Sequence, residues 1–213
     1  SQVTLTQLNG GAPANSNGII GGWATVGGTD WAVWAAPSGG SGGVGALGVL
    51  PNPINTTPFG AYSSNPFATG TGTDNIRTTA TATSAASPTF NSLNVAAAAA
   101  TTLTVSGTLT LASGGLLINS GANALTISGG TGITSGGSEL FIHTNTGAGV
   151  NTIATPITGA GVSLVKAGAG GLVLTGNNSY AGGNTYVNGG TPTPNPASAN
   201  ANASCRPSFI NAP

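Results

Sequence analysis

Apolar residues in the second half of the chain occur in pairs separated by a single residue. The intervening residue is often polar, as at Thr104, Thr110 and Ser163. Side chains alternate between the two faces of a strand, so a spacing of two predicts short strands with one buried face. Clusters of Gly, Asn and Ser separate the pairs and are typical of turns. The pairs are Leu103 and Val105, Leu109 and Leu111, Leu116 and Ile118, Leu125 and Ile127, Leu140 and Ile142, Val162 and Leu164, and Leu172 and Leu174.

Short strands between turns fit two architectures. One is an antiparallel sandwich or barrel, and the other is a β-solenoid in which every coil supplies two or three strands and stacks on the next. Hairpin signals discriminate poorly, because Asn188-Gly189 is nearly alone as a tight-turn dipeptide. The scarcity of charge favours the solenoid, whose stacked strands leave few edges that need charged residues to protect them. Small polar residues are then expected to form ladders from coil to coil.

The chain divides into four stretches of different character. Residues 1–34 contain short apolar segments separated by Gly-Gly, and residues 35–75 are rich in Gly and Pro, which predicts an irregular loop region. Residues 101–190 carry the most regular strand pattern. Residues 191–213 are a Pro-, Asn- and Ala-rich tail without strand periodicity, which we expect to be disordered. We therefore predict a solenoid segment over residues 1–190.

Composition supports a β-rich chain and excludes a large class of partners. Of 213 residues 37 are Gly, only 3% are charged, and the formal net charge is zero. No basic patch exists to hold phosphates, so we expect no nucleic-acid partner. Disordered chains combine low hydrophobicity with high net charge, whereas 38% of these residues are hydrophobic. Thr, Ser and Asn take the polar role that Lys and Glu usually fill.

Cysteine content and apolar runs say little about targeting. Cys205 is the only cysteine, so the chain forms no internal disulfide. No apolar run reaches the roughly 18 residues of a membrane helix. No secretory leader follows Ser1, which fits either a removed signal peptide or an internal fragment.

Residues 164–191 carry a motif with many fixed positions. It consists of a strand ending in Lys, a Gly-rich turn, an L-x-L strand, an Asn-x-Tyr turn, a Gly-Gly corner and a strand closing on Asn-Gly-Gly. The stretch resembles the autotransporter-associated β-strand repeat, departing from it only at Gly171 and Asn184, where Thr is common. Residues 17–32 and 139–143 also look similar to segments near such repeats. The motif positions are Lys166, Gly168, Gly170, Leu172, Leu174, Gly176, Asn178, Tyr180, Gly182, Gly183, Asn188, Gly189 and Gly190.

This resemblance implies a fold, a location and a role. The fold is a right-handed parallel β-helix, and the chain is a passenger segment exported across the bacterial outer membrane to the extracellular side or cell surface. The implied role is that of a structural or adhesive stalk. The outer-membrane barrel of the same precursor is the expected partner, although this sequence does not contain it. Surface glycans, or the surfaces of host or neighbouring cells, are further expected partners.

Candidate catalytic residues are few. His143 should point outward into solvent beside Phe141, since Leu140 and Ile142 take the inward phase. Asp30 and Asp74 are possible paired carboxylates for glycoside hydrolysis, but 44 positions and a Gly/Pro loop separate them. The GxGxxG string at residues 43–48 lacks the strand and helix that a dinucleotide site requires. We therefore assign no catalytic residue, cofactor or metal, and expect no enzyme.

Aromatic residues leave a second function open. Trp23, Trp31 and Trp34 are candidates for a sugar-stacking platform, although Trp31 and Trp34 face opposite ways in a strand, so at least one should be packed. A carbohydrate-binding β-helix module is thus the alternative to the stalk. A polysaccharide-degrading β-helix enzyme is a more distant one, because it needs more acids and bases than the chain carries. Lys166 is interpreted as a strand-end residue of the repeat.

Overall fold

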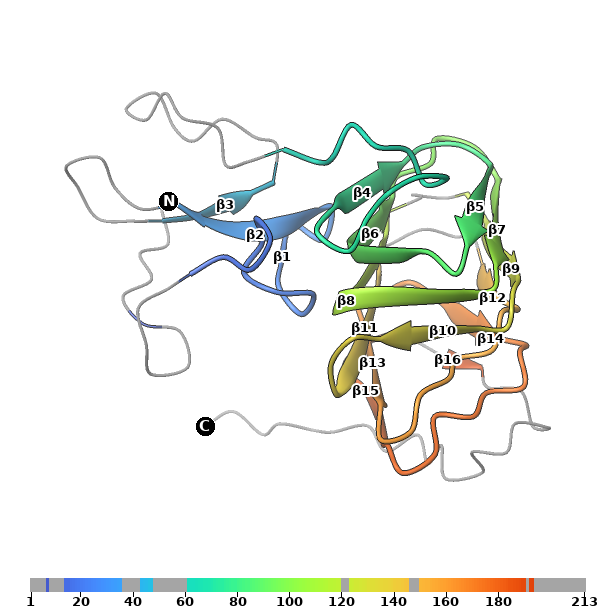
Figure 1. Ribbon diagram of the computed structural model, residues 1–213. Coiled ribbons are helices and arrows are strands. Elements are labelled where there is room, and N and C mark those ends of the chain that lie inside the picture. Colours follow the sequence, from blue (N-terminus) through green and yellow to red (C-terminus); the bar gives the residue numbers. More distant parts are fainter. Residues whose placement is uncertain are drawn as a thin grey trace, which may run out of the picture.

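Two long parallel sheets form the body of the molecule (Figure 1). The computed structural model describes residues 7, 14–35, 43–47, 61–119, 123–145, 150–190 and 192–193, and these residues contain strands but no helix. Sheet 1 contains β4 (Asn75–Thr78), β6 (Thr89–Val95), β8 (Thr108–Ile118), β10 (Gly132–Ser135), β11 (Glu139–Thr144), β13 (Ser163–Ala167) and β15 (Thr185–Val187). Sheet 2 contains β5 (Ala82–Ala86), β7 (Thr101–Ser106), β9 (Leu125–Gly129), β12 (Asn151–Ile153), β14 (Leu172–Leu174) and β16 (Pro192–Thr193).

The chain alternates between the two sheets, and every strand pair within them is parallel. The order β15-β13-β11-β8-β6-β4 in sheet 1 and the order β16-β14-β12-β9-β7-β5 in sheet 2 each skip the intervening strand of the other sheet. A shorter third side closes each coil, where β10 pairs with the first half of β8 and Ile133 bridges Ile157. This is a β-solenoid, so the predicted all-β stacked-coil fold is confirmed.

Aliphatic side chains line the inside of the solenoid in continuous columns. In sheet 2, Leu103, Ile127 and Ile153 are register partners from one coil to the next, and each is 0–1% exposed. Burial of such apolar surface contributes about 25 cal/mol per Å² to folding. The predicted alternation therefore places the buried face correctly. The equivalent column of sheet 1 runs through Ile76, Leu93, Leu116 and Ile142.

Small polar residues replace charged ones on the outside. On the outer face of sheet 2, Thr102, Thr126 and Thr152 are register partners in three successive coils. Thr102 is exposed and Thr126 and Thr152 are partly exposed, whereas Leu103 and Ile127 beside them in the chain are buried. The expected ladders of small polar residues are thus present, and a repeated hydroxyl serves where a repeated charge would repel itself.

An aromatic side chain packs against the core at the first coil. Phe67 precedes β4, is 2% exposed, and its ring lies 5.6 Å from that of Phe90. Gly70 lies so close to Ile76 and Phe90 that a Cβ there would come within 2.6 Å of the Ile76 side chain. The segment leading into β4 therefore belongs to the same hydrophobic core as the coils.

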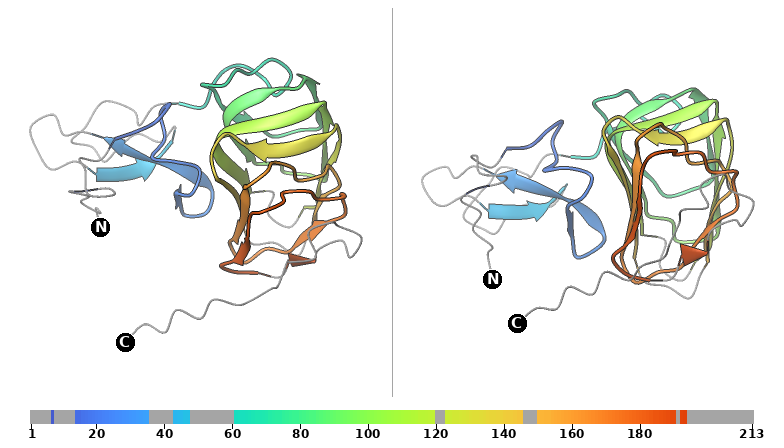
Figure 2. Two further views of the ribbon diagram at one scale, coloured as in Figure 1. Left: turned by 60° about the horizontal axis from the view of Figure 1, so that its bottom comes forward. Right: turned by 90° about the horizontal axis from the view of Figure 1, so that it is seen from below.

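The N-terminal residues form a separate small sheet. We call residues 14–35 and 43–47 the N-terminal unit, which contains β1 (Thr25–Val26), β2 (Asp30–Ala35) and β3 (Gly43–Ala46). These strands pair antiparallel, and Gly27 and Gly28 reverse the chain with φ angles of 62° and 69°. Figure 2 shows the N-terminal unit beside the column of coils rather than on its end.

The structure therefore differs from the expected domain boundaries. The solenoid strands begin at Asn75 and not in residues 1–34, because the Gly-Gly separators there form hairpin turns instead of coil corners. Within the expected loop region 35–75, residues 43–46 form β3, while 36–42 and 48–60 lie outside the described residues. Of the expected tail 191–213, residues 192–193 form β16 on β14, and the prediction for 194–213 also lies outside them.

Candidate functional site

Lys166 lies at the end of β13, as predicted, and its side chain points into the solenoid. It is the register partner of Ile142 in the inward column of sheet 1 and is 0% exposed. Its Nζ donates hydrogen bonds to the carbonyl oxygens of Ala167 (3.0 Å), Gly168 (2.7 Å) and Gly189 (2.9 Å). Burial lowers its pKa to about 8, so the ammonium form still predominates at neutral pH. Three carbonyl dipoles therefore hold a buried positive charge without a carboxylate partner.

These hydrogen bonds join two successive coils. Ala167 and Gly168 follow β13, whereas Gly189 follows β15 in the next coil, 23 positions beyond Lys166. Gly190 has a φ of 69°, and a Cβ at this position would come within 2.9 Å of the Lys166 Nζ. The closing Asn-Gly-Gly and the Lys of the repeat thus form one corner. The Lys166 ammonium binds a carbonyl of this Asn-Gly-Gly segment, and the absence of a side chain at Gly190 leaves room for the ammonium.

Other motif positions also contact the preceding coil. The side chain of Asn178 is 2% exposed, and its Oδ1 accepts a hydrogen bond of 2.8 Å from the Ile157 amide. The ring of Tyr180 is 3% exposed, and its hydroxyl lies 2.9 Å from the Thr185 hydroxyl. Gly183 passes so close to the Val162 carbonyl that a Cβ would overlap it. Leu172 and Leu174 are buried in the core cluster. Asn178 and Gly183 thus contact the preceding coil, whereas the Tyr180 hydroxyl contacts Thr185 in its own coil.

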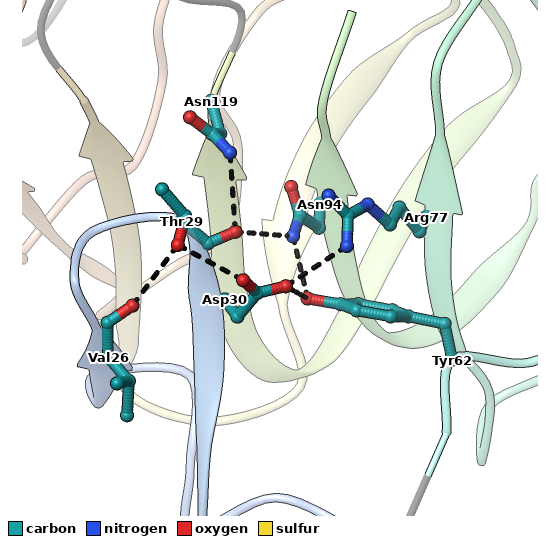
Figure 3. Close-up of polar contacts among 7 residues, drawn as sticks. All are labelled: Val26, Thr29, Asp30, Tyr62, Arg77, Asn94 and Asn119. Carbon is teal, nitrogen blue, oxygen red and sulfur yellow. Dashed lines mark hydrogen bonds and ion pairs between the residues drawn. The ribbon is translucent and has the colours of Figure 1, made fainter. Parts of the chain in front are cut away.

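A polar cluster attaches the N-terminal unit to the first coils (Figure 3). The Asp30 carboxylate accepts hydrogen bonds from the Tyr62 hydroxyl and the Thr29 hydroxyl and forms an ion pair of 3.1 Å with Arg77. Asn94 donates to the Tyr62 hydroxyl and to the Thr29 carbonyl. Burial raises the pKa of Tyr62 to about 12, so its hydroxyl stays protonated and acts as the donor to Asp30. These contacts join β2 to β4 and β6.

A second cluster and an apolar patch complete this interface. Asn75 donates to the carbonyl of Asn17 at 2.6 Å, and Asn17 in turn donates to the Asn91 side chain at 3.2 Å. The buried Trp31 belongs to an apolar cluster with Leu117 of β8, on the outer face of sheet 1. The remaining buried members of this cluster are Ile19, Val33 and Leu47. The N-terminal unit is thus held by hydrogen bonds at the first coils and by apolar packing below them.

The three tryptophans do not form one platform. Trp31 is 0% exposed, so its prediction as a sugar-stacking residue is wrong: the solenoid covers the ring that a ligand would need. Trp34 is partly buried, whereas Trp23 is 47% exposed. The expectation that at least one of the three is packed is met by Trp31. Tyr186 on β15, which the sequence did not single out as a ligand contact, is 45% exposed.

His143 points outward, as the strand phase predicts, but solvent does not surround it. Its Nε2 lies 3.0 Å from the Gly22 carbonyl of the N-terminal unit. Its ring is perpendicular to that of Trp31 at 5.9 Å and stacks on Phe141 at 6.5 Å. The expectation of a solvated histidine is therefore wrong. Local periodicity predicts the direction of a side chain but does not predict which distant residues pack against it.

The two candidate carboxylates are engaged separately. Asp30 belongs to the cluster of Figure 3, whereas Asp74 accepts hydrogen bonds from the amide and hydroxyl of Thr71 and from Asn65. The Asn65 side chain, foremost among these donors, lowers the pKa of Asp74 to about 2. Each carboxylate thus stabilises local structure. Among the described residues no group of three or more His, Cys, Asp or Glu side chains could hold a metal ion, and no helix is long and apolar enough to span a membrane.

Comparison with known protein families gives a match to the segment that contains the Lys166 corner. Parallel sheets stacked in successive coils define a β-solenoid protein. Residues 164–191 match the family model described as the passenger-associated-transport-repeat. The repeat and the solenoid together fit an autotransporter passenger repeat protein, in agreement with the resemblance seen in the sequence. No curated protein matches the chain. No solved structure matches it either.

Proposed function

We propose that this chain is a structural stalk segment of an autotransporter passenger, displayed outside the cell. The observation that carries the proposal is the corner in which Lys166 binds the Gly189 carbonyl of the next coil. In such an architecture each coil contacts mainly its neighbours, so a rod lengthens by adding coils without any new long-range contact. A neutral outer surface with hydroxyl ladders suits a rod that must not attract other macromolecules nonspecifically.

A non-catalytic role agrees with the chemistry of the described residues. General acid–base catalysis needs a group that reaches a substrate and changes protonation state near the working pH. Asp30 is held by Arg77 and Tyr62, and Asp74 by Thr71 and Asn65. Both carboxylates are therefore already used as hydrogen-bond acceptors, and their separate partners favour structural roles over a paired catalytic one.

Removal of one coil tests the stalk. Deleting residues 142–165 joins Phe141 to Lys166, which is the register partner of Ile142, so the strand phase is preserved. The rod should shorten by about 4.8 Å, and antibodies against the chain should label intact cells that carry the whole precursor as well as they label cells with the wild type. Labelling that requires lysed cells, for both chains, would contradict surface display, and loss of a substrate-degrading activity in the shortened chain would contradict the non-catalytic stalk.

Adhesion to neutral glycans is a second proposed role, supported by the exposed aromatic rings of Trp23 and Tyr186. Aromatic faces stack on sugar rings through their apolar surface, and the near absence of charge favours an uncharged ligand. Binding of the whole chain to immobilised neutral glycans should fall on Trp23→Ala or Tyr186→Ala. The control is Val150→Ala, because Val150 is equally exposed at 54% but has no aromatic face. Equal binding by all four chains would count against this role.

A further inference from the structure

One outward row of sheet 1 forms the surface on which the N-terminal unit lies. Arg77, Asn94, Leu117 and His143 are register partners or neighbours in the same row of β4, β6, β8 and β11. Arg77 and Asn94 meet polar groups of the unit, and Leu117 meets Trp31. His143 is thus the last of the four contacts and the only histidine of the chain.

The N-terminal unit partly covers the imidazole of His143. The Gly22 carbonyl accepts a hydrogen bond of 3.0 Å from Nε2, and the plane of the Trp31 ring makes an angle of 81° with the plane of the imidazole. The Gly22 backbone lies directly on Gly115 of β8, so that a Cβ on Gly115 would come within 2.6 Å of the Gly22 Cα. The segment cannot lift away from Gly115 without also losing its hydrogen bond to His143.

No carboxylate compensates a charge on this imidazole. On its own strand, Glu139 lies four residues earlier and is exposed. In the N-terminal unit, Asp30 is bound to Arg77, Tyr62 and Thr29. Leu117 faces the imidazole from β8, and Lys166 on β13 contributes a positive charge. A second positive charge at this place would therefore be half-buried beside aromatic rings, with the Gly22 carbonyl as its hydrogen-bond partner.

We propose that His143 makes the attachment of the N-terminal unit to the solenoid acid-sensitive, so that protonation of the imidazole loosens the unit. Loosening exposes the buried faces of Trp31 and Leu117, which lie against each other when the unit is attached. The unit then changes from a fixed part of the rod to a tethered element, because the polypeptide chain still joins it to the first coil.

The direction of the pH effect follows from linkage. Burial, followed by the charge of Lys166, lowers the pKa of His143 in the attached state below its ordinary value of 6.5, against the smaller opposing effect of the Gly22 carbonyl. When the unit is detached, the imidazole meets water and regains the ordinary pKa. Attachment is therefore at full strength above pH 6.5 and weakens as the pH falls through the lowered value, by at most tenfold in the equilibrium constant per pH unit for one proton.

The experiment uses the full chain with Trp23→Phe and Trp34→Phe, which leaves Trp31 as the only fluorescent tryptophan. Acrylamide quenching of Trp31 should increase severalfold as the pH falls from 7.5 to 5. In the same background, His143→Gln keeps a neutral donor for the Gly22 carbonyl and should show constant quenching over this range. The control Asp30→Asn removes the carboxylate of the interface and should leave the response to pH intact.

A direct titration of His143 in the wild-type chain tests the proposal without any variant that could fail to fold. Because the chain has a single histidine, its imidazole proton resonance reports one pKa by nuclear magnetic resonance. A pKa below 6.5, matching the midpoint of the quenching curve, supports the proposal. A pKa of 6.5 or above, or a quenching curve that is the same in His143→Gln as in the parent, overturns it.

Discussion

Replacing Lys166 by Met separates two opposing energies in the repeat corner. The substitution removes three hydrogen bonds to backbone carbonyls, each worth about 1.5–3 kcal/mol when the donor is charged. It also removes the cost of burying an ammonium group, which is several kcal/mol. Met continues the aliphatic column of Ile142 and Leu116 and adds apolar burial. The carbonyls of Ala167, Gly168 and Gly189 then lose their charged donor at a partly buried corner.

We expect the carbonyls to decide the outcome. Leaving a part-buried acceptor without a donor costs up to about 1–3 kcal/mol. The apolar gain of one methionine end and the relieved burial of the ammonium group offset much of the sum over the three acceptors. The net loss should be about 1–3 kcal/mol, which lowers Tm by about 2–12 °C in a chain of this size. The loss should also be local, since Lys166 joins only two coils.

The assay combines thermal unfolding with native-state hydrogen exchange. The amide of Asn188, which donates to the Lys166 carbonyl, should exchange faster in Lys166→Met, while amides of β7 and β9 should keep their protection. Ile142→Met is the matched control, because it changes shape in the same column at a cost usually below about 1.5 kcal/mol. A Lys166→Met chain as stable as the wild type, or more stable, would refute the reasoning, since desolvation would then outweigh the carbonyl contacts.

Three further changes address other contacts. Phe67→Ala should lower the free energy of unfolding by about 3–5 kcal/mol, because it leaves a cavity at the first coil. Denaturant titration measures this loss, and Tyr186→Ala at an exposed position is the control. Equal effects of the two substitutions would contradict a core role for Phe67. Gly183→Ala should disrupt β15, because a methyl group overlaps the Val162 carbonyl, and normal protection of the β15 amides would refute this. Asp74 contributes stability that is complete above its ordinary pKa of 3.8 and is lost as the pH falls to about 2; acid unfolding of Asp74→Asn should lack this component, and identical acid transitions would contradict it.

The sequence predicted the solenoid well because its signal is local. Spacing of two at Leu103 and Val105, or at Leu140 and Ile142, requires only that side chains alternate, and all four residues are buried. The same phase places Lys166 inward with Leu164. The sequence analysis placed it at a strand end without predicting its hydrogen-bond partners, because three backbone carbonyls from two different corners are not visible in a linear pattern.

The N-terminal unit was not predictable in the same way. Its contacts join residues far apart in the chain, as Nε2 of His143 and the carbonyl of Gly22 do over 121 positions. Apolar pairs in β2 look like those of a coil. The residues near Trp31 in the sequence do not indicate that its ring packs against Leu117. Periodicity gave the buried face of each strand, whereas the identity of the covering element depends on tertiary packing.

The unequal lengths of the coils explain how such a chain can diverge without losing its fold. Leu93 aligns with Leu116 after 23 positions, Leu116 with Ile142 after 26, and Lys166 with Val187 after 21. What stays constant is the direction of the inward side chain, and the corners take up each extra or missing residue. Mutations that insert or delete residues are therefore tolerated at the corners while the strands stay in phase. Related rods can thus acquire coils of different lengths, and a motif of fixed length then matches few of their coils.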